Sequence, residues 1–531
     1  MNDFKVNKIN SNSKRLKKIL SDVQEENNLF SKVRNPPKVS IITKSGINLS
    51  IFISLAIIGI LCFAIIKILS GMNFNTVLVA AGESLQKDNN DHTNILIMGT
   101  GTKDHEGSDL TDTIISASYD HNKKTITMIS IPRDLHVKDP KFNSMRINEL
   151  YFMANRELKN SPEALEYMIE KTEELTGLEY QYYIKINFDG FKEIIDKLGG
   201  IDVNVKTGIY DPFYPKGETS LYEIFSIQPG LQHMDGETAL KYARSRKTSS
   251  DFDRSNRQQE IILAVKDQTI KTAATLNIEA LQELLETAQN NIETNFSVRE
   301  IMSAAGLMGD IPRERIYSRL LHDNPVDCGG FLYTPLLELY GGAFVLIPAG
   351  DPSYVTKYFD LLTNDPEYLN ENLKIQILNA TKLSGAAAEQ KQVLQRYCMN
   401  ITRFGNGLTQ DNLNTKIYYK MIPLPKKNPD DEIKFYKPNT VEILKKYFFP
   451  TAIESTEIPQ AYKNLGYDQS ADIIIELGSD YTNSDGYMED AFYELYDQIY
   501  NPNTVLSTDP ADTTTTNPTT ETIPAQPSKT E

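Results

Sequence analysis

An uninterrupted apolar run over residues 47–69 constrains the architecture of this chain more than any other feature. It reads INLSIFISLAIIGILCFAIIKIL, and its one charged residue, Lys67, lies near its end. As an α-helix the run spans ~34 Å, enough to cross the hydrocarbon core of a bilayer. A cleavable signal peptide is the alternative, but its apolar part is shorter and lies closer to the N-terminus. We therefore predict a transmembrane helix over residues 47–69.

The charge on either side of this run predicts its orientation. Residues 1–46 hold ten Lys or Arg and four Asp or Glu, a net charge of +6, whereas the whole chain carries −16. Because basic flanks stay in the cytoplasm, we expect a single-pass protein of the cell membrane, with a cytoplasmic basic arm (1–46) and an extracytoplasmic body. That body carries −22 and is a poor partner for nucleic acid phosphates. No nucleic acid partner is expected.

The 531 residues are too many for one ordinary domain. Residues 70–92 read as a connector, and residues 93–360 as an α/β domain with α-β-α layers, because predicted strands alternate with amphipathic helices. Strands are predicted at 94–99, 113–118, 124–131 and 201–205, and helices at 161–176, 188–198 and 236–243. The first of these helices has Ser161 as its expected N-cap, Pro162 in the first turn and Gly177 as its stop.

A smaller α+β domain is predicted over residues 370–485. Its expected strands are 374–378, 400–404, 416–420 and 472–477, and its helices are 385–397 and 441–448. This βαββαβ order is typical of a ferredoxin-like split unit. Residues 501–531 are rich in Thr and Pro with few large apolar residues, which predicts a disordered tail. Of the three cysteines, Cys328 and Cys398 could pair, although nothing in the sequence requires it.

Aspartates and arginines concentrate at predicted strand and helix ends between residues 109 and 258. The segments are DLTDT (109–113), SIPRD (130–134), YARSR (242–246) and DFDRSNRQ (251–258). Carboxylates bind hard cations and arginines clamp phosphate oxygens in pairs. The combination predicts a pyrophosphate held through a metal.

Each segment also has a simpler interpretation. Asp112 alone could close a turn, Arg133 and Asp134 could form a surface ion pair, and a charged helix face is often only solvated. Several arginine-bearing segments without interleaved glutamates favour an anion site. The chain has no Walker loop, no GxSxG and no HExxH, which disfavours an NTPase, a serine hydrolase and a zinc enzyme.

At this point the sequence resembles a known family. NILIMG, DLTDT, SIPRD, RINEL (146–150), KLGGIDVNV, PGLQHMDGETALKYARSRK and SDFDRSNRQQ are similar, in this order, to the motifs of the LytR-CpsA-Psr (LCP) envelope proteins. The resemblance covers roughly residues 93–350. KIQILNATKLSG and ADIIIELGSDY resemble the LytR C-terminal domain that often follows.

The resemblance implies a phosphotransferase. Family members move a glycopolymer from a polyprenyl-pyrophosphate carrier to a peptidoglycan hydroxyl, and apolar residues between the helices enclose the lipid chain. Carried over to this sequence, Asp112 would hold Mg²⁺ (or Mn²⁺), with Asp109 as a further candidate ligand. Asp134 would support the metal or orient Arg133, and Asp251 is the candidate base for the incoming hydroxyl. The expected pyrophosphate ligands are Arg133, Arg244, Arg246, Arg254, Arg257 and Gln258.

Two positions depart from the usual family pattern. An aspartate is expected shortly after Gly99, where this chain has Thr100, Gly101 and Thr102. An arginine is expected two residues before Asp112, where Leu110 stands. Asp104, His105 and Asp109 lie close by in the sequence, and a variant branch of the family shows a similar pattern.

The expected function is therefore that of a membrane-anchored, extracytoplasmic glycopolymer–peptidoglycan phosphotransferase. Three rivals stay open from the sequence alone. They are a lipid-pyrophosphate hydrolase that uses the same site, a non-catalytic envelope-binding protein, and a transcriptional attenuator, a label that the family has carried.

Overall fold

The computed structural model describes residues 84–481, apart from 103–108, 217–220, 246–250, 274–290, 298–299, 301–302, 305–306, 308–310 and 427–430. The predicted basic arm, transmembrane segment (47–69) and C-terminal tail lie outside the described residues. Among the helices that are described, none is long and apolar enough to cross a membrane.

A six-stranded mixed sheet forms the centre of the region before residue 321. Its order is β11-β6-β1-β2-β3-β12. The strands are β1 (His92–Thr100), β2 (Thr113–Asp120), β3 (Thr125–Ile131), β6 (Tyr182–Asn187), β11 (Ile292–Thr294) and β12 (Ile316–Leu320). β1 and β2 are antiparallel, as are β2 and β3, whereas β6 and β12 run parallel to their neighbours β1 and β3. The three predicted strands at 94–99, 113–118 and 124–131 are confirmed.

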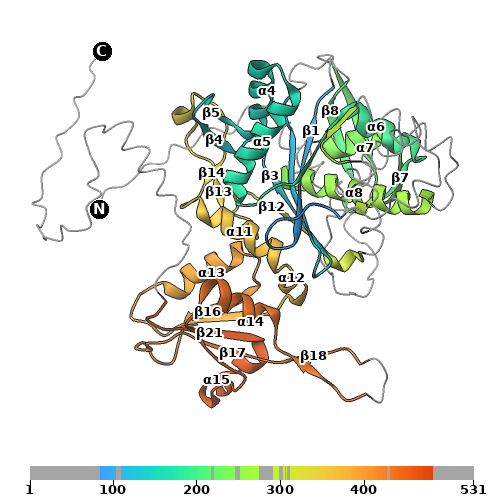
Figure 1. Cartoon of the computed structure of the whole chain (residues 1–531). Helices are drawn as coiled ribbons and strands as arrows, with labels where there is room; N and C mark the ends of the chain where they lie inside the picture. Colours follow the sequence, from blue (N-terminus) through green and yellow to red (C-terminus); the bar gives the residue numbers. More distant parts are fainter. Residues whose placement is uncertain are drawn as a thin grey trace, which may run out of the picture. The chain divides into compact units, whose positions relative to one another are not determined.

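This sheet is covered on both faces. Ile95 and Ile97 of β1 pack in one apolar cluster, with residues of α6 (Phe188–Lys197), α7 (Gly236–Arg244) and α8 (Asp251–Ala273). Leu96 and Met98 pack in the other, with residues of α4 (Ile147–Leu158) and α5 (Ser161–Thr176). Figure 1 shows the two helix groups on either side of the strands. The continuous apolar runs of β1 to β3 fit a sheet with no solvated face, and the predicted α-β-α layering is observed.

Local signals define the helix ends. Asn187 caps α6 and Asp235 caps α7, each by accepting from a backbone N–H three residues on. α5 ends at Gly177, whose φ of 70° suits glycine. The predicted cap of α5 was wrong by one residue, because Asn160 is the N-cap and Ser161 already lies in the helix.

Short two-stranded antiparallel sheets also belong to this region. β7 (Ile201–Val205) pairs with β10 (Gly230–Met234), and β8 (Ile209–Pro215) with β9 (Tyr222–Ile227). The others are β4 (His136–Asp139) with β5 (Asn143–Arg146), and β13 (Leu332–Tyr333) with β14 (Ile347–Pro348). The 3₁₀ turns are η1 (Arg313–Arg315) and η2 (Leu337–Tyr340), and α11 (Ser353–Asn364) and α12 (Tyr368–Glu371) follow.

A five-stranded sheet lies between residues 375 and 477. Its order is β16-β15-β21-β17-β20. The strands are β15 (Ile375–Asn379), β16 (Ile401–Asn406), β17 (Lys416–Tyr419), β20 (Ile453–Ser455) and β21 (Ile473–Leu477), and the helical elements are α13 (Ala386–Arg396), α14 (Asn439–Ile443), the π-helical η3 (Leu444–Phe448), α15 (Gln460–Asn464) and α16 (Tyr467–Ser470). The predicted elements occur in the predicted order, with β20, α15 and α16 as additions.

The ferredoxin-like pairing predicted for this sheet is wrong. A split unit leaves room for another strand between the two parallel strands that a helix connects. Here β15 pairs directly with β16 across α13, and β17 pairs directly with β20. β21 fills the space between β15 and β17, parallel to the first and antiparallel to the second. Both connections are therefore ordinary adjacent crossovers, which the order of elements alone cannot distinguish from split ones.

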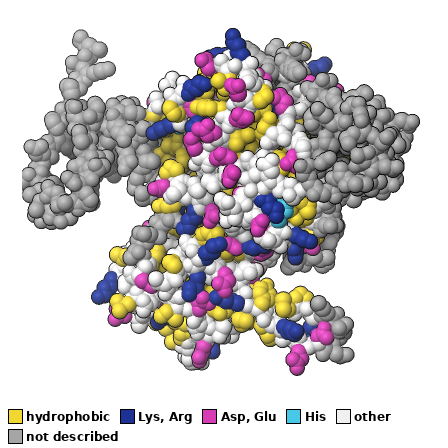
Figure 2. Space-filling view, in the orientation of Figure 1, with side chains coloured by type: hydrophobic (Ala, Val, Ile, Leu, Met, Phe, Trp, Pro, Cys, Tyr) yellow, Lys and Arg dark blue, Asp and Glu magenta, His cyan; other side chains and the backbone are white. Residues whose placement is uncertain are grey.

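A short arm extends from this region. β18 (Ile422–Pro423) pairs with β19 (Phe435–Tyr436), and Leu424, Ile433 and Phe435 are about half exposed. Figure 2 shows hydrophobic side chains along this arm at the lower right.

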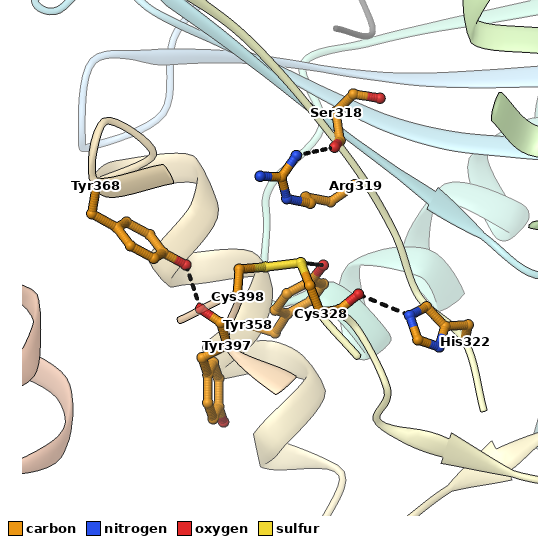
Figure 3. Close-up of a disulfide and its surroundings, with 8 residues drawn as sticks. All are labelled: Ser318, Arg319, His322, Cys328, Tyr358, Tyr368, Tyr397 and Cys398. Atoms are coloured by element: carbon orange, nitrogen blue, oxygen red, sulfur yellow. Dashed lines mark hydrogen bonds between the residues drawn. A yellow bond between two sulfur atoms is a disulfide. The ribbon is translucent and has the colours of Figure 1, made fainter. Parts of the chain in front are cut away.

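A disulfide joins the two sheet regions. It links Cys328, after β12, to Cys398, after α13, across 70 residues of sequence (Figure 3). His322 Nε2 lies 2.8 Å from the carbonyl oxygen of Cys328, and the Tyr368 hydroxyl donates to the carbonyl oxygen of Tyr397 at 2.6 Å. One apolar cluster also contains residues of both sheets. The pairing of the two cysteines, left open by the sequence, is thereby settled.

Candidate functional site

The antiparallel pairing of β2 and β3 brings two predicted site segments together. Ile114 pairs with Ile131 in an antiparallel register. Asp112, two residues before Ile114, and Arg133, two residues after Ile131, therefore lie opposite each other at one end of the sheet. Arg133 Nη1 donates to Asp112 Oδ1 at 2.8 Å. The aspartate side chain is 41% exposed and the arginine 21%. The pair is therefore open to a ligand.

Arg133 belongs to a series of alternating charges. Its Nε lies 3.4 Å from Asp134 Oδ2, and Asp134 Oδ1 lies 3.6 Å from Arg146 Nη1. Arg146 also donates to Glu149 Oε1 at 2.6 Å, at the start of α4. Asp134 is only 7% exposed, and each of its oxygens faces a guanidinium. From this position Asp134 is better placed to orient Arg133 than to bind a metal directly.

The remaining charged residues of the site come from α7 and α8. Arg254 and Gln258 are four positions apart and share one face of α8. Both residues line two neighbouring cavities, of about 190 and 340 Å³, together with Asp112, Thr113 and Arg133. Arg244, the last residue of α7, lines the larger cavity. The structure thus brings three of the predicted arginines, the glutamine and the predicted metal ligand to one hollow.

An apolar cavity adjoins the charged residues of this hollow. The Arg244 guanidinium lies 4.4 Å from the centre of the Phe188 ring, a cation–π contact. A third cavity, of about 50 Å³, lies between α6, α7 and α8 and is lined by Phe188, Phe191, Leu240 and Ile262 as well as Arg244 and Gln258. The charged residues therefore stand at the edge of an apolar recess.

Arg257 is separated from this group. It faces another side of α8, is only 6% exposed, and donates to the carbonyl oxygens of Tyr242 (2.8 Å) and Ser245 at the end of α7. Burial lowers the pKa of its guanidinium. Arg257 lines a different cavity, with Lys206 and Glu260. It holds α7 against α8, and the prediction that it joins the phosphate ligands is not supported by its position.

Other predicted residues cannot be placed at the site. Arg246, Asp104 and His105 lie outside the described residues, and Asp251 begins α8 but its side chain is not described. Asp109 accepts from Asn155 of α4 at 3.2 Å and does not line the cavities that contain Asp112.

The donor set fits a hard cation in part. Within the described ranges, no group of three or more His, Cys, Asp or Glu could hold a metal ion. Mg²⁺, however, is commonly held by one or two carboxylates together with substrate phosphates and water. Asp112 contacts Arg133 and Asn148 through Oδ1, which leaves Oδ2 for a cation. Asn148 is 2% exposed, and its amide oxygen accepts no hydrogen bond from the described residues.

Sequence reasoning missed several residues of this site. Asp211 and Tyr214 of β8 line the larger cavity. Asp211 is 2% exposed and accepts from Ser245 Oγ at 2.8 Å. The one available signal was a carboxylate at an inward position of an alternating strand. Arg146 and Asn148 belong to RINEL, a segment that the resemblance marks without indicating a role.

Part of the chain matches the model of a known protein family. Residues 72–334, just under half of the chain, match the model of the LytR_cpsA_psr family. Over these residues the chain is similar to the LytR-CpsA-Psr proteins. The family match ends before the five-stranded sheet, so the resemblance of residues 370–485 to the LytR C-terminal domain stays a prediction.

Relatives of this part of the chain carry the names of teichoic acid transferases. The polyisoprenyl-teichoic acid–peptidoglycan teichoic acid transferase TagV of Bacillus subtilis is 32% identical over 39% of this chain and 50% of its own length. TagT of Bacillus subtilis, with the same transferase name, is 24% identical over 47% of this chain and 76% of its own length. The crystal structure of Bacillus subtilis TagV matches with 25% identity and a TM-score of 0.39, over 52% of this chain and 99% of that one. In the sequence comparison, the chain spans about half the length of TagV.

Proposed function

We propose that this protein is a membrane-anchored, extracytoplasmic phosphotransferase that moves a glycopolymer from a polyprenyl-pyrophosphate carrier to peptidoglycan. One observation carries the proposal: Arg133, Arg244, Arg254 and Gln258 surround a hollow that also contains Asp112. Guanidinium groups on several sides suit a pyrophosphate, because each guanidinium can bind two phosphate oxygens. Related domains carry the names of teichoic acid transferases, which favours this chemistry over others at the same site.

The residues have distinct proposed roles. Phosphoryl transfer depends mainly on positioning and charge neutralisation. Arg133, Arg244 and Arg254 hold the pyrophosphate oxygens, and Asp134 keeps Arg133 in place. Mg²⁺, held by Asp112 and the phosphates, would neutralise further charge as the acceptor hydroxyl bonds to the glycan-linked phosphorus and polyprenyl monophosphate leaves. Asp251 keeps its proposed role as the base for the acceptor hydroxyl.

Two features support the lipid carrier and the compartment. The apolar recess between α6, α7 and α8 is the natural position for the first part of a polyprenyl chain whose pyrophosphate lies against Arg244. The Cys328–Cys398 disulfide suits an oxidising environment outside the cytoplasm. Both agree with a single-pass anchor at residues 47–69 and a body on the outer face.

A transfer assay tests the function. The full chain is reconstituted in liposomes with a glycan on polyprenyl pyrophosphate, Mg²⁺ and peptidoglycan fragments. We expect a glycan–peptidoglycan phosphodiester, detected by mass spectrometry, and its loss when a chelator removes the metal. Arg133→Ala should abolish the product, whereas Arg403→Ala, on β16 of the other sheet, should not.

The other outcomes separate the rivals. Release of phosphorylated glycan without attachment to peptidoglycan would indicate a hydrolase. Tight binding of the lipid carrier without turnover would indicate a binding protein. Full activity of Arg133→Ala would refute the assignment of the site.

A further inference from the structure

The β8–β9 hairpin exposes an unusual number of large apolar side chains. They are Tyr210 (57% exposed), Phe213 (54%), Leu221 (62%), Tyr222 (63%) and Ile224 (66%). We call these five residues the hairpin face. Single exposed apolar residues are common on protein surfaces, but a contiguous group marks a contact with another apolar partner.

The face results from the alternation of the two strands. Ile209, Tyr214, Phe225 and Ile227 point inward and belong to the apolar cluster beneath the sheet. In a hairpin with one solvated side, the outward positions are normally polar. Here Tyr210 and Ile224 take outward positions, and the rings of Phe213 and Tyr222 meet edge to face, with centroids 5.9 Å apart. The hairpin is thus apolar on both sides.

The same hairpin forms a wall of the candidate site. Asp211, Phe213, Tyr214 and Pro215 line the larger cavity together with Arg133, Arg244 and Arg254. Phe213 belongs both to the hairpin face and to the lining of this cavity, so the face adjoins the candidate site.

We propose that the hairpin face docks on the phospholipid bilayer and inserts into the boundary between headgroups and acyl chains. The inference rests on the proposed function, because a polyprenyl pyrophosphate has its phosphates at this boundary. Docking there presents the arginines to the carrier without drawing the lipid far out of the membrane. Residues 70–83 join the predicted transmembrane helix to the described body, and even fully extended they span no more than ~50 Å. The body is therefore always close to the bilayer.

The composition of the face favours lipid over a glycan or a second copy of the chain. Sugars bind to aromatic rings together with amide or carboxylate groups that satisfy their hydroxyls. The hairpin face instead combines aromatic rings with aliphatic Leu221 and Ile224, and Ser226 is a small exposed polar residue of β9. Tyrosines accompanied by aliphatic side chains are typical of segments at the membrane interface, where the ring is buried and the hydroxyl stays wet.

The absence of tryptophan from the sequence allows a direct test. Tyr222→Trp gives the full chain a single tryptophan on the hairpin face, and Leu413→Trp gives a matched control at an exposed residue (74%) that precedes β17. Each variant is reconstituted in liposomes with and without brominated phosphatidylcholine, whose bromines quench nearby tryptophans. We expect Tyr222→Trp to lose about half of its emission, since interfacial segments insert roughly 5–10 Å. Leu413→Trp should be unaffected.

Three outcomes would overturn the proposal. The first is equal quenching of the two variants by brominated lipid. The second is protection of Tyr222→Trp by soluble glycan fragments, which would indicate a sugar platform. The third is a blue shift in lipid-free detergent that depends on protein concentration, which would indicate a second copy.

An activity measurement separates this inference from the proposed function. Ile224→Ser should raise the KM for a long-chain carrier in liposomes about tenfold, and should leave kcat and the KM for a water-soluble short-chain carrier unchanged. If the wild-type protein transfers no glycan at all, the proposed function fails while the quenching experiment can still be read. Transfer by the wild type with an unchanged KM in Ile224→Ser would reject the docking surface alone.

Discussion

The two sheets of this protein use charged side chains in opposite ways. At the end of the six-stranded sheet, Asp112 and Arg133 stay partly exposed and line a hollow. In the five-stranded sheet, the carboxylate of Glu476 is only 5% exposed and accepts from Asn412, Tyr418 and Tyr462. Charges of the first kind are available to a ligand, whereas those of the second kind are occupied by the fold itself. Exposure and the number of internal partners therefore distinguish a site from a structural network.

α8 contains both kinds of charge within one turn. Arg254 lines the hollow, and the buried Arg257 bonds the end of α7. Arg254→Ala should lower transfer by roughly 100- to 1000-fold, the usual cost of one preorganised charge-stabilising group, with little change in the free energy of unfolding. Arg257→Ala should lower the free energy of unfolding by roughly 1–3 kcal/mol, because two buried carbonyls lose their donor. Transfer kinetics and urea denaturation measure the two effects. Equal losses of transfer rate and of unfolding free energy in the two variants would contradict the different roles of Arg254 and Arg257.

The disulfide lets the coupling of the two sheets be tested. Replacing Cys328 and Cys398 together by serine should lower the free energy of unfolding by roughly 2–4 kcal/mol, because the 70-residue loop is no longer closed in the unfolded chain. Transfer at 25 °C should be unchanged, since neither residue lines the hollow. Urea denaturation with and without a reductant measures the effect, and Cys62→Ser is the control. A double variant that loses activity at full stability would show that the link serves the site directly.

Much of the first sheet could be predicted because its signals are local. Apolar runs mark β1 to β3, and Gly177 ends α5 through its backbone preference for a positive φ. The pairing of the second sheet could not be predicted, because β21 enters between β15 and β17 from far along the chain. The same order of elements fits more than one arrangement of strands.

The site was predictable in kind but not in detail. Asp112 and Arg133 were marked by their segments, and one antiparallel register was enough to bring them together. Arg257 has the same spacing signal as Arg254 and Gln258, and only the packing of α7 against α8 shows that it points elsewhere. Asp211 comes from a hairpin whose one signal, a carboxylate at an inward position of an alternating strand, does not indicate a function.

The buried carboxylate of the second sheet should matter for stability alone. Burial and the nearby Glu476 carboxylate raise the pKa of Tyr418 and Tyr462, so both hydroxyls remain donors at neutral pH. Glu476→Ala removes their acceptor and should lower the free energy of unfolding by about 2 kcal/mol. Glu476→Gln keeps one oxygen and should cost less. Thermal unfolding measures the order of the two variants, and a loss of transfer in Glu476→Gln at unchanged stability would contradict a purely structural role.

Histidine titration gives the smallest expected difference between the sheets. All six histidines precede residue 323, so the five-stranded sheet has none. Burial, followed by repulsion from Lys87, lowers the pKa of His121 from 6.5 to about 4. The folded state therefore favours neutral His121, and its contribution is complete above pH 6.5 and is lost as the pH falls towards 4. Allowing for solvent screening, the free energy of unfolding should fall by about 1 kcal/mol between pH 7 and 4.5 through this group. Urea denaturation at the two pH values should show a smaller decrease in His121→Gln than in the wild type, and equal decreases would exclude His121 as the cause.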